Sequence, residues 1–225
     1  TSYVLHISGF KTSYINKAYT QGTAPLDLST IYKQRGTWAL DTLRLFFWHN
    51  PLFESRLTWR QRLHYFEIAW AYIVSALAVP ILFFLPPITL FLDKHIILNE
   101  TAYLFLRVPS LAAILYFYYR LSGRLISTSQ FWAGLSFVYL KALVLSLLPI
   151  KIKYKVTNKL AGVGKRDFIL IAPHFIFIIF GVSAVVWRIF FVDFKLTSFT
   201  AVNMIWIALM IFWFAPIIRK GFRLE

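Results

Sequence analysis

Residues 65–92 read YFEIAWAYIVSALAVPILFFLPPITLFL, and this stretch decides the fold class. It is long enough to cross a bilayer, and Glu67 is its only charged residue. Its three prolines are compatible with a membrane helix, where neighbouring helices satisfy the freed backbone groups. Similar apolar runs occupy residues 102–119, 168–192 and 196–218. We therefore predict a mainly α-helical membrane protein with four transmembrane helices and additional amphipathic interfacial helices.

The composition supports a membrane protein over a soluble domain. Hydrophobic residues make up 59% of the 225-residue chain and aromatic residues 19%. The chain has no cysteine, which excludes a disulfide, a zinc thiolate site and a thiol nucleophile. It begins at Thr1 without a methionine or a recognisable leader, so we expect it to be a piece of a longer protein.

The net charge of +15 has a topological explanation. Residues 1–62 contain eight Lys and Arg, residues 120–166 contain nine and residues 219–225 contain three, whereas the connector 93–101 contains only Lys94. Basic residues gather on the cytoplasmic side of membrane proteins. We therefore predict that both termini and the 120–166 segment are cytoplasmic, in a bacterial inner membrane or a plasma membrane. A nucleic-acid partner is not needed to explain the charge.

The apolar run at residues 131–150 carries Lys141 in its middle. A charge at the bilayer centre costs roughly 2.5–3.5 kcal/mol on insertion scales. This favours an interfacial helix, which also preserves the alternation of basic segments. The alternative is a fifth span in which Lys141 extends its side chain to the interface.

Residues 28–47 have apolar residues at helical spacing, and their charges make them too polar to span a membrane. We predict an amphipathic interfacial helix with Ser29 as its N-cap. Gln34 and Trp38 lie one turn apart on one face, and Arg35 is about 100° around from Gln34. An indole can stack on a sugar ring, an amide can bind hydroxyl groups and a guanidinium can neutralise phosphate. The alternative is that Trp38 simply anchors the helix at the membrane interface.

The predicted span at 168–192 contains two polar residues, His174 and Arg188. Polar groups at membrane depth are candidates for function. His174 follows Pro173, so we expect a structural hydrogen bond to a freed carbonyl, with a role in translocation as the alternative. Arg188 lies near the end of the run, and we expect it to extend towards the interface.

Four motifs occur in a meaningful order: TSYVLH at 1–6, APLDL at 24–28, QRGTW at 34–38 and YKVTNK at 154–159. The ordered set resembles the membrane-embedded, processive family 2 glycosyltransferases of the cellulose synthase type. In that family T-S-x-x-L-H-x-x-G follows a catalytic T-E-D motif, Q-x-x-R-W lies on an interfacial helix, and F-x-V-T-x-K forms a gating loop. Thr37 stands where the family has the arginine before the tryptophan, so the resemblance implies that Arg35 takes the place of that arginine at the diphosphate.

The resemblance implies a division of the chain into three parts. Residues 1–28 would be the C-terminal edge, a short remnant, of a cytoplasmic α/β catalytic domain of the GT-A type. Residues 29–62 would be the interfacial helix region, and 63–225 the transmembrane domain with a cytoplasmic gating loop at about 151–166. The implied substrate-binding residues are Gln34, Arg35 and Trp38. The implied gating-loop residues are Tyr154, Val156, Thr157 and Lys159.

The resemblance also implies an activity for the full-length protein, as a UDP-sugar-dependent hexosyltransferase. It would extend a β-linked polysaccharide, most simply a cellulose-like glucan, and thread it through the lipid bilayer, with accessory subunits as further partners. The general base and the ligands of a divalent cation (Mg²⁺ or Mn²⁺) are expected upstream of Thr1, so this chain would hold no catalytic residue and no metal ligand. The alternative is a non-enzymatic membrane carrier or assembly subunit, and the sequence encoded upstream of Thr1 would decide between them.

Overall fold

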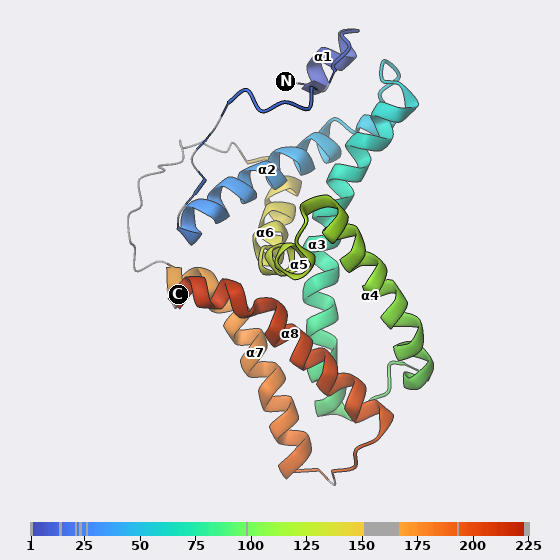
Figure 1. Cartoon of the computed structure of the whole chain (residues 1–225), viewed down its shortest axis with the longest axis vertical. Helices are drawn as coiled ribbons and strands as arrows, with labels where there is room; N and C mark the ends of the chain where they lie inside the picture. Colours follow the sequence, from blue (N-terminus) through green and yellow to red (C-terminus); the bar gives the residue numbers. More distant parts are fainter. Residues whose placement is uncertain are drawn as a thin grey trace. The chain divides into compact units, whose positions relative to one another are not determined.

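The computed structural model describes residues 2–13, 15–20, 22, 24–25, 27–97, 99–150, 167–192 and 194–222. These residues are mostly helical, and none of them forms a strand. In chain order the helices are α1 (Ser2–Ile7), α2 (Leu28–Trp48), the short 3₁₀ turn η1 (Pro51–Phe53), α3 (Trp59–Leu92), α4 (Glu100–Ser122), α5 (Leu125–Gly134), α6 (Ser136–Leu147), α7 (Asp167–Phe190) and α8 (Ser198–Phe222) (Figure 1).

Three of the described helices are long and apolar enough to cross a membrane: α3, α7 from Phe168, and α8. They correspond to three of the four predicted spans. The α5–α6 pair also has the required length and apolarity if its two helices form one broken span, because they meet at a bend of 43°. Helix α4 occupies the remaining predicted span but is not among these candidates, so its crossing of the membrane stays a prediction.

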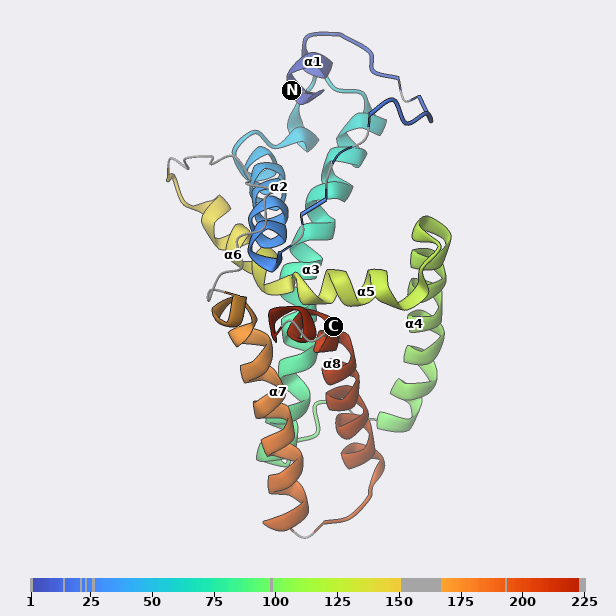
Figure 2. The same ribbon diagram turned by 60° about the vertical axis from the view of Figure 1, so that its left-hand side comes forward.

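The region predicted as one interfacial helix over 131–150 differs from that prediction. Helix α5 begins earlier, at Leu125, and the chain bends at Leu135 before α6 begins (Figure 2). The bend is stabilised by His174 of α7, whose Nε2 donates a hydrogen bond to the Gly134 carbonyl at 2.7 Å. A Cβ atom at Gly134 would lie 3.1 Å from the Ile217 side chain of α8, so this position has little room for a side chain.

His174 therefore has the structural role that we expected, but with a different partner. The partner is a carbonyl of another helix, not the one freed by Pro173. The imidazole is fully buried, and the rings of Phe137 and Phe214 contact it edge-to-face with centroids 4.8 Å away.

The chain divides into two compact units, which we describe separately. The first contains residues 1–76 and 138–163, and thus includes α1, α2, the first half of α3 and most of α6. The second contains residues 77–137 and 164–225.

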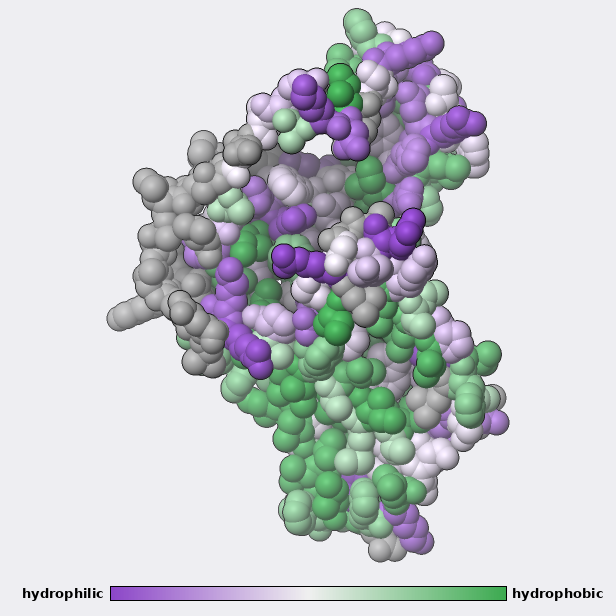
Figure 3. All heavy atoms as spheres, viewed as in Figure 1, coloured by the Kyte–Doolittle hydropathy of each residue, from purple (hydrophilic) through white to green (hydrophobic). Residues whose placement is uncertain are grey.

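In the second unit α8 is the central helix, since it packs against α4, α5 and α7. Its apolar side chains form much of the buried core, including Val202, Ile207, Met210 and Phe214. The outer sides of α7 and α8 are covered by apolar side chains (Figure 3), as expected for helices that contact lipid.

Arg188 lies in the second unit, and its side chain is paired within the protein. It is largely buried and forms an ion pair with Asp93, just after α3, with an N–O distance of 2.6 Å. Its guanidinium also lies 5.9 Å from the centre of the Phe199 ring. A buried charge needs a partner of opposite sign, and Asp93 provides it.

Helix α2 begins as predicted but with a different cap. Asp27, not Ser29, is the N-cap residue, and its carboxylate accepts a hydrogen bond from the Thr30 amide at 2.7 Å. The hydroxyl groups of Ser29 and Thr30 donate to the same carboxylate. Burial of Asp27 raises its pKa, but these hydrogen bonds outweigh that effect, so the net result is a lowered pKa.

Candidate functional site

The candidate site is built on one face of α2, in the first unit. Gln34 and Trp38 lie one helical turn apart, so both side chains are on the same face. Gln34 is half-buried, whereas the Trp38 side chain is 48% exposed. The pair combines a large apolar ring with a neighbouring amide that can donate and accept hydrogen bonds, which suits a sugar.

Arg35 lies over the Trp38 ring. Its guanidinium carbon is 4.9 Å from the ring centroid, within the range of a cation–π contact. The structure thus brings together all three residues predicted from QRGTW, and it gives Arg35 a contact that the sequence did not predict. Diphosphate binding by Arg35 remains a prediction.

Thr37 occupies the position of the family arginine and has a local role. Its hydroxyl donates a hydrogen bond to the Lys33 carbonyl one turn earlier, at 2.8 Å. Threonine in a helix commonly satisfies its hydroxyl in this way. The Thr37 side chain therefore binds its own helix, and Arg35 is the nearest arginine to Trp38 in sequence.

The opposite side of α2 packs against α6. A Cβ atom at Gly36 would lie 3.2 Å from the Val138 side chain, so the absence of a side chain lets the two helices approach closely. The next residue of α6 is the buried Tyr139, whose ring contacts the Tyr72 ring of α3 edge-to-face, with centroids 5.1 Å apart. The helix that carries QRGTW thus has α6 behind it.

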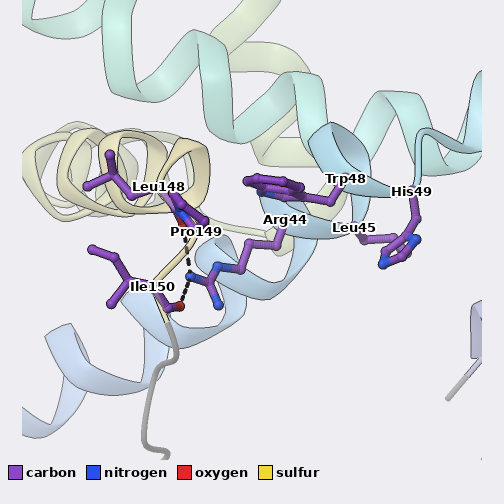
Figure 4. A pocket seen from close by; sticks show the side chains of 7 residues that line it. All are labelled: Arg44, Leu45, Trp48, His49, Leu148, Pro149 and Ile150. Carbon is purple, nitrogen blue, oxygen red and sulfur yellow. Dashed lines mark hydrogen bonds between the residues drawn. The ribbon is translucent and has the colours of Figure 1, made fainter.

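Two further residues of α2, Arg44 and Trp48, bind the C-terminal end of α6. The Trp48 Nε1 donates to the Ser146 carbonyl at 2.8 Å. The Arg44 guanidinium donates to the carbonyls of Leu148 and Ile150, just after α6 (Figure 4). These residues line a groove of about 520 Å³ together with Leu45, His49 and Pro149. Sequence reasoning missed both, because their partners lie about 100 residues away in the chain.

The TSYVLH motif lies near the start of α3. His6 is within 2.9 Å of the Tyr65 hydroxyl through Nδ1 and of the Thr12 hydroxyl through Nε2. The Tyr3 ring contacts the Tyr65 ring edge-to-face. These contacts connect the N-terminal segment to the start of α3, within the unit that also contains QRGTW.

The predicted gating-loop residues Tyr154, Val156, Thr157 and Lys159 lie outside the described residues. Among the residues that are described, no group of three or more His, Asp or Glu side chains could hold a metal ion. The divalent cation and its ligands upstream of Thr1 therefore stay an expectation from the family resemblance.

The fold and the site define the class of the protein: a set of apolar, membrane-length helices joined to an amphipathic helix that presents a glutamine and a tryptophan. Comparison with known proteins gives the family. Residues 1–207 match the family described as cellulose synthase, and the chain belongs to this family.

Individual relatives agree with this assignment. The chain is 27% identical over 184 residues to cellulose synthase-like protein D3 of Arabidopsis thaliana, a match that covers 74% of this chain and 16% of that protein. It is 28% identical over 184 residues to cellulose synthase-like protein D1 of the same plant, covering 74% and 18%. Cellulose synthase-like protein D2 of Oryza sativa subsp. japonica is 27% identical over 179 residues, covering 72% and 15%. The chain therefore spans less than a fifth of the length of these relatives. No solved structure matches it.

Proposed function

We propose that this chain is the transmembrane part of a processive glycosyltransferase that extends a β-linked polysaccharide, most simply a cellulose-like glucan. The full-length enzyme would use a UDP-sugar in the cytoplasm and pass the product outward across the membrane. Trp38 would hold the acceptor end of the growing chain, and Gln34 would bind its hydroxyl groups. The catalytic base and the metal ligands would lie upstream of Thr1.

One observation carries the proposal: a chain of the cellulose synthase family places Gln34 and a half-exposed Trp38 on one face of α2. An exposed indole offers an apolar surface of the size of a pyranose ring. A simple membrane anchor would need the tryptophan but would not need a glutamine one turn away. The pairing therefore favours sugar binding over anchoring.

The chemistry requires a well-held acceptor. A hydroxyl oxygen at the end of the growing chain attacks the anomeric carbon of the UDP-sugar, the bond from that carbon to the diphosphate breaks, and UDP leaves. The hydroxyl proton passes to the upstream base. A divalent cation would neutralise the charge of the leaving diphosphate. The contribution of this chain is to orient the acceptor, which lowers the entropic part of the barrier.

The proposal is tested in membranes that contain the full-length enzyme, by incorporation of labelled glucose from UDP-glucose into insoluble polymer. Trp38→Ala should abolish synthesis at near-normal folded yield, and Trp38→Phe should retain part of it, because a smaller ring still stacks. Trp59→Ala is the control, since Trp59 is also exposed, 67%, but begins α3 away from the motif.

Normal activity per folded protein in Trp38→Ala would refute the sugar-binding role. A lower yield with normal specific activity would instead identify Trp38 as an anchor. If the wild-type enzyme makes no polymer from UDP-glucose, UDP-N-acetylglucosamine or UDP-glucuronic acid, the proposed activity is wrong.

A further inference from the structure

The C-terminal end of α6 is held by side chains of α2. The last carbonyl groups of an α-helix have no partner within the helix and need one from elsewhere. The Ser146 carbonyl in the last turn of α6 accepts a hydrogen bond from Trp48 of α2. The carbonyls of Leu148 and Ile150, just after α6, accept hydrogen bonds from Arg44 (Figure 4). The positive charge of Arg44 also suits the negative end of the α6 dipole.

The two binding residues lie beyond the candidate site, towards the C-terminal end of α2. Arg44 and Trp48 are four residues apart and share one face, as the hydrogen bonds to α6 require. Around the helix, Trp38 is about 120° from Arg44 and about 80° from Trp48. Helix α2 thus presents Gln34 and Trp38 in its first half and middle, and it binds the end of α6 through its last two turns.

The same pair of helices is in close contact near the motif itself. Gly36 lies within QRGTW, and Val138 of α6 occupies the space that a larger side chain would fill. The QRGTW helix is thus supported by α6 at two places, at Gly36 and at the Arg44–Trp48 pair. Together these contacts restrict both sliding and rotation of α2 against α6.

We propose that Arg44 and Trp48 are positioning residues for sugar transfer: they fix the orientation of α2 against the end of α6, and so fix Trp38 and Gln34 where the acceptor must lie. The inference rests on the proposed function. Neither residue needs to touch the sugar. Transfer is sensitive to such support, because a displacement of about 1 Å at the reacting groups costs roughly 100-fold in rate.

The role predicts a specific kinetic pattern. UDP-sugar binding depends mainly on residues expected upstream of this chain, so the KM for UDP-sugar should change little when α2 is loosened. The acceptor would be held less accurately, so kcat for polymer synthesis should fall. UDP-sugar that reacts with water instead of the acceptor should form a larger share of the turnover.

The test uses the full-length enzyme and two mild variants with matched controls. Trp48→Phe keeps an aromatic ring but removes the N–H donor, and Arg44→Met keeps an unbranched apolar side chain but removes the charge and the donors. The controls are Trp59→Phe and Arg60→Met, because Trp59 and Arg60 are exposed at the start of α3. Arg44→Lys is the conservative variant, since its ammonium group can still donate to carbonyls.

We expect kcat to fall five- to tenfold in Trp48→Phe and Arg44→Met at an unchanged KM for UDP-sugar. The hydrolysed fraction should rise in both, Arg44→Lys should recover part of the loss, and the controls should match the wild type. Unchanged kcat and hydrolysis per folded enzyme in both variants would overturn the inference, even if their folded yield falls. That result would leave the proposed function standing, whereas an inactive wild type would refute the proposed function instead.

Discussion

Trp38 and Trp48 lie on the same helix and are about equally exposed, at 48% and 53%, yet their surroundings differ. Trp48 uses its indole N–H to bind the Ser146 carbonyl, which is the behaviour of an anchor. Trp38 has the Arg35 guanidinium over its ring and Gln34 one turn away. At the level of single residues, Trp48 therefore ties α2 to α6, and sugar binding stays the prediction for Trp38.

The contact between Arg35 and Trp38 leads to a prediction about the missing family arginine. We expect Arg35→Met to lower transfer about fivefold, since a cation–π contact of about 1 kcal/mol would be lost. Adding Thr37→Arg should not restore the rate, because residue 37 is adjacent to Trp38 in sequence and leaves the helix in a different direction from residue 35. Rates of polymer synthesis per folded enzyme provide the measurement. Full recovery in the double variant would show that an arginine at either position is sufficient and that the contact with the Trp38 ring is not required.

His174 gives a prediction about stability at the residue scale. His174→Ala should lower the free energy of unfolding by about 1–3 kcal/mol, because the buried Gly134 carbonyl loses its donor. His174→Gln keeps a donor and should cost less. Unfolding of the purified protein in detergent micelles measures both. An equal loss in the two variants would show that ring packing against Phe137 and Phe214, and not the hydrogen bond, sets the stability.

At the scale of elements, long apolar runs and helical spacing predicted the positions of helices well. The predicted run at 65–92 ends at the same residue as α3, and the start of α2 at Leu28 was also predicted correctly. The bend at Leu135 was not predictable, because it depends on His174 and Ile217, which are distant in sequence. The prediction of Ser29 as the N-cap of α2 was wrong, because aspartate and serine are both good capping residues. Only the structure shows that the Asp27 carboxylate accepts the hydrogen bond from a first-turn amide, that of Thr30.

The Asp27 cap makes the start of α2 sensitive to acid. Its folded-state pKa is lowered relative to the ordinary value of 3.8, so its stabilisation is present above that pH and is lost as pH falls through the folded pKa. Asp27→Ala should destabilise α2 by about 1 kcal/mol at pH 7. Asp27→Asn should keep most of the cap but lose the acid sensitivity. Hydrogen exchange of the first-turn amides at pH 7 and well below pH 3.8 (corrected for the intrinsic rate) tests this, and an acid response retained in Asp27→Asn would contradict it.

At the scale of the whole molecule, the ordered motifs identified the family, and the family match over residues 1–207 confirmed it. They could not show how QRGTW is supported. Arg44 and Trp48 look like ordinary residues of an amphipathic helix, and their importance depends on α6, whose end lies about 100 residues further along the chain. Local patterns thus suggest candidate substrate-binding side chains, which stay predictions, whereas the supporting contacts depend on tertiary structure.

The membrane topology can be tested, because either α4 or the bent α5–α6 pair could be the fourth span. If α4 crosses and the α5–α6 pair stays at the cytoplasmic interface, the start of α5 is cytoplasmic, as the nearby Arg120 and Arg124 favour. If α4 does not cross and α5–α6 is a broken span, the start of α5 faces outward. Both arrangements place the connector after α3 outside. They place the exposed Ser127, near the start of α5, on opposite sides of the membrane.

We expect Ser127→Cys in this cysteine-free chain to resist an impermeant thiol reagent added from outside and to react after permeabilisation. Ile96→Cys, which is exposed in the connector after α3, should react from outside and serves as the positive control. Ser55→Cys, which is exposed before α3, should react only after permeabilisation. Labelling of Ser127→Cys from outside would assign the fourth span to the bent pair, because apolarity would then have outweighed the cost of burying Lys141.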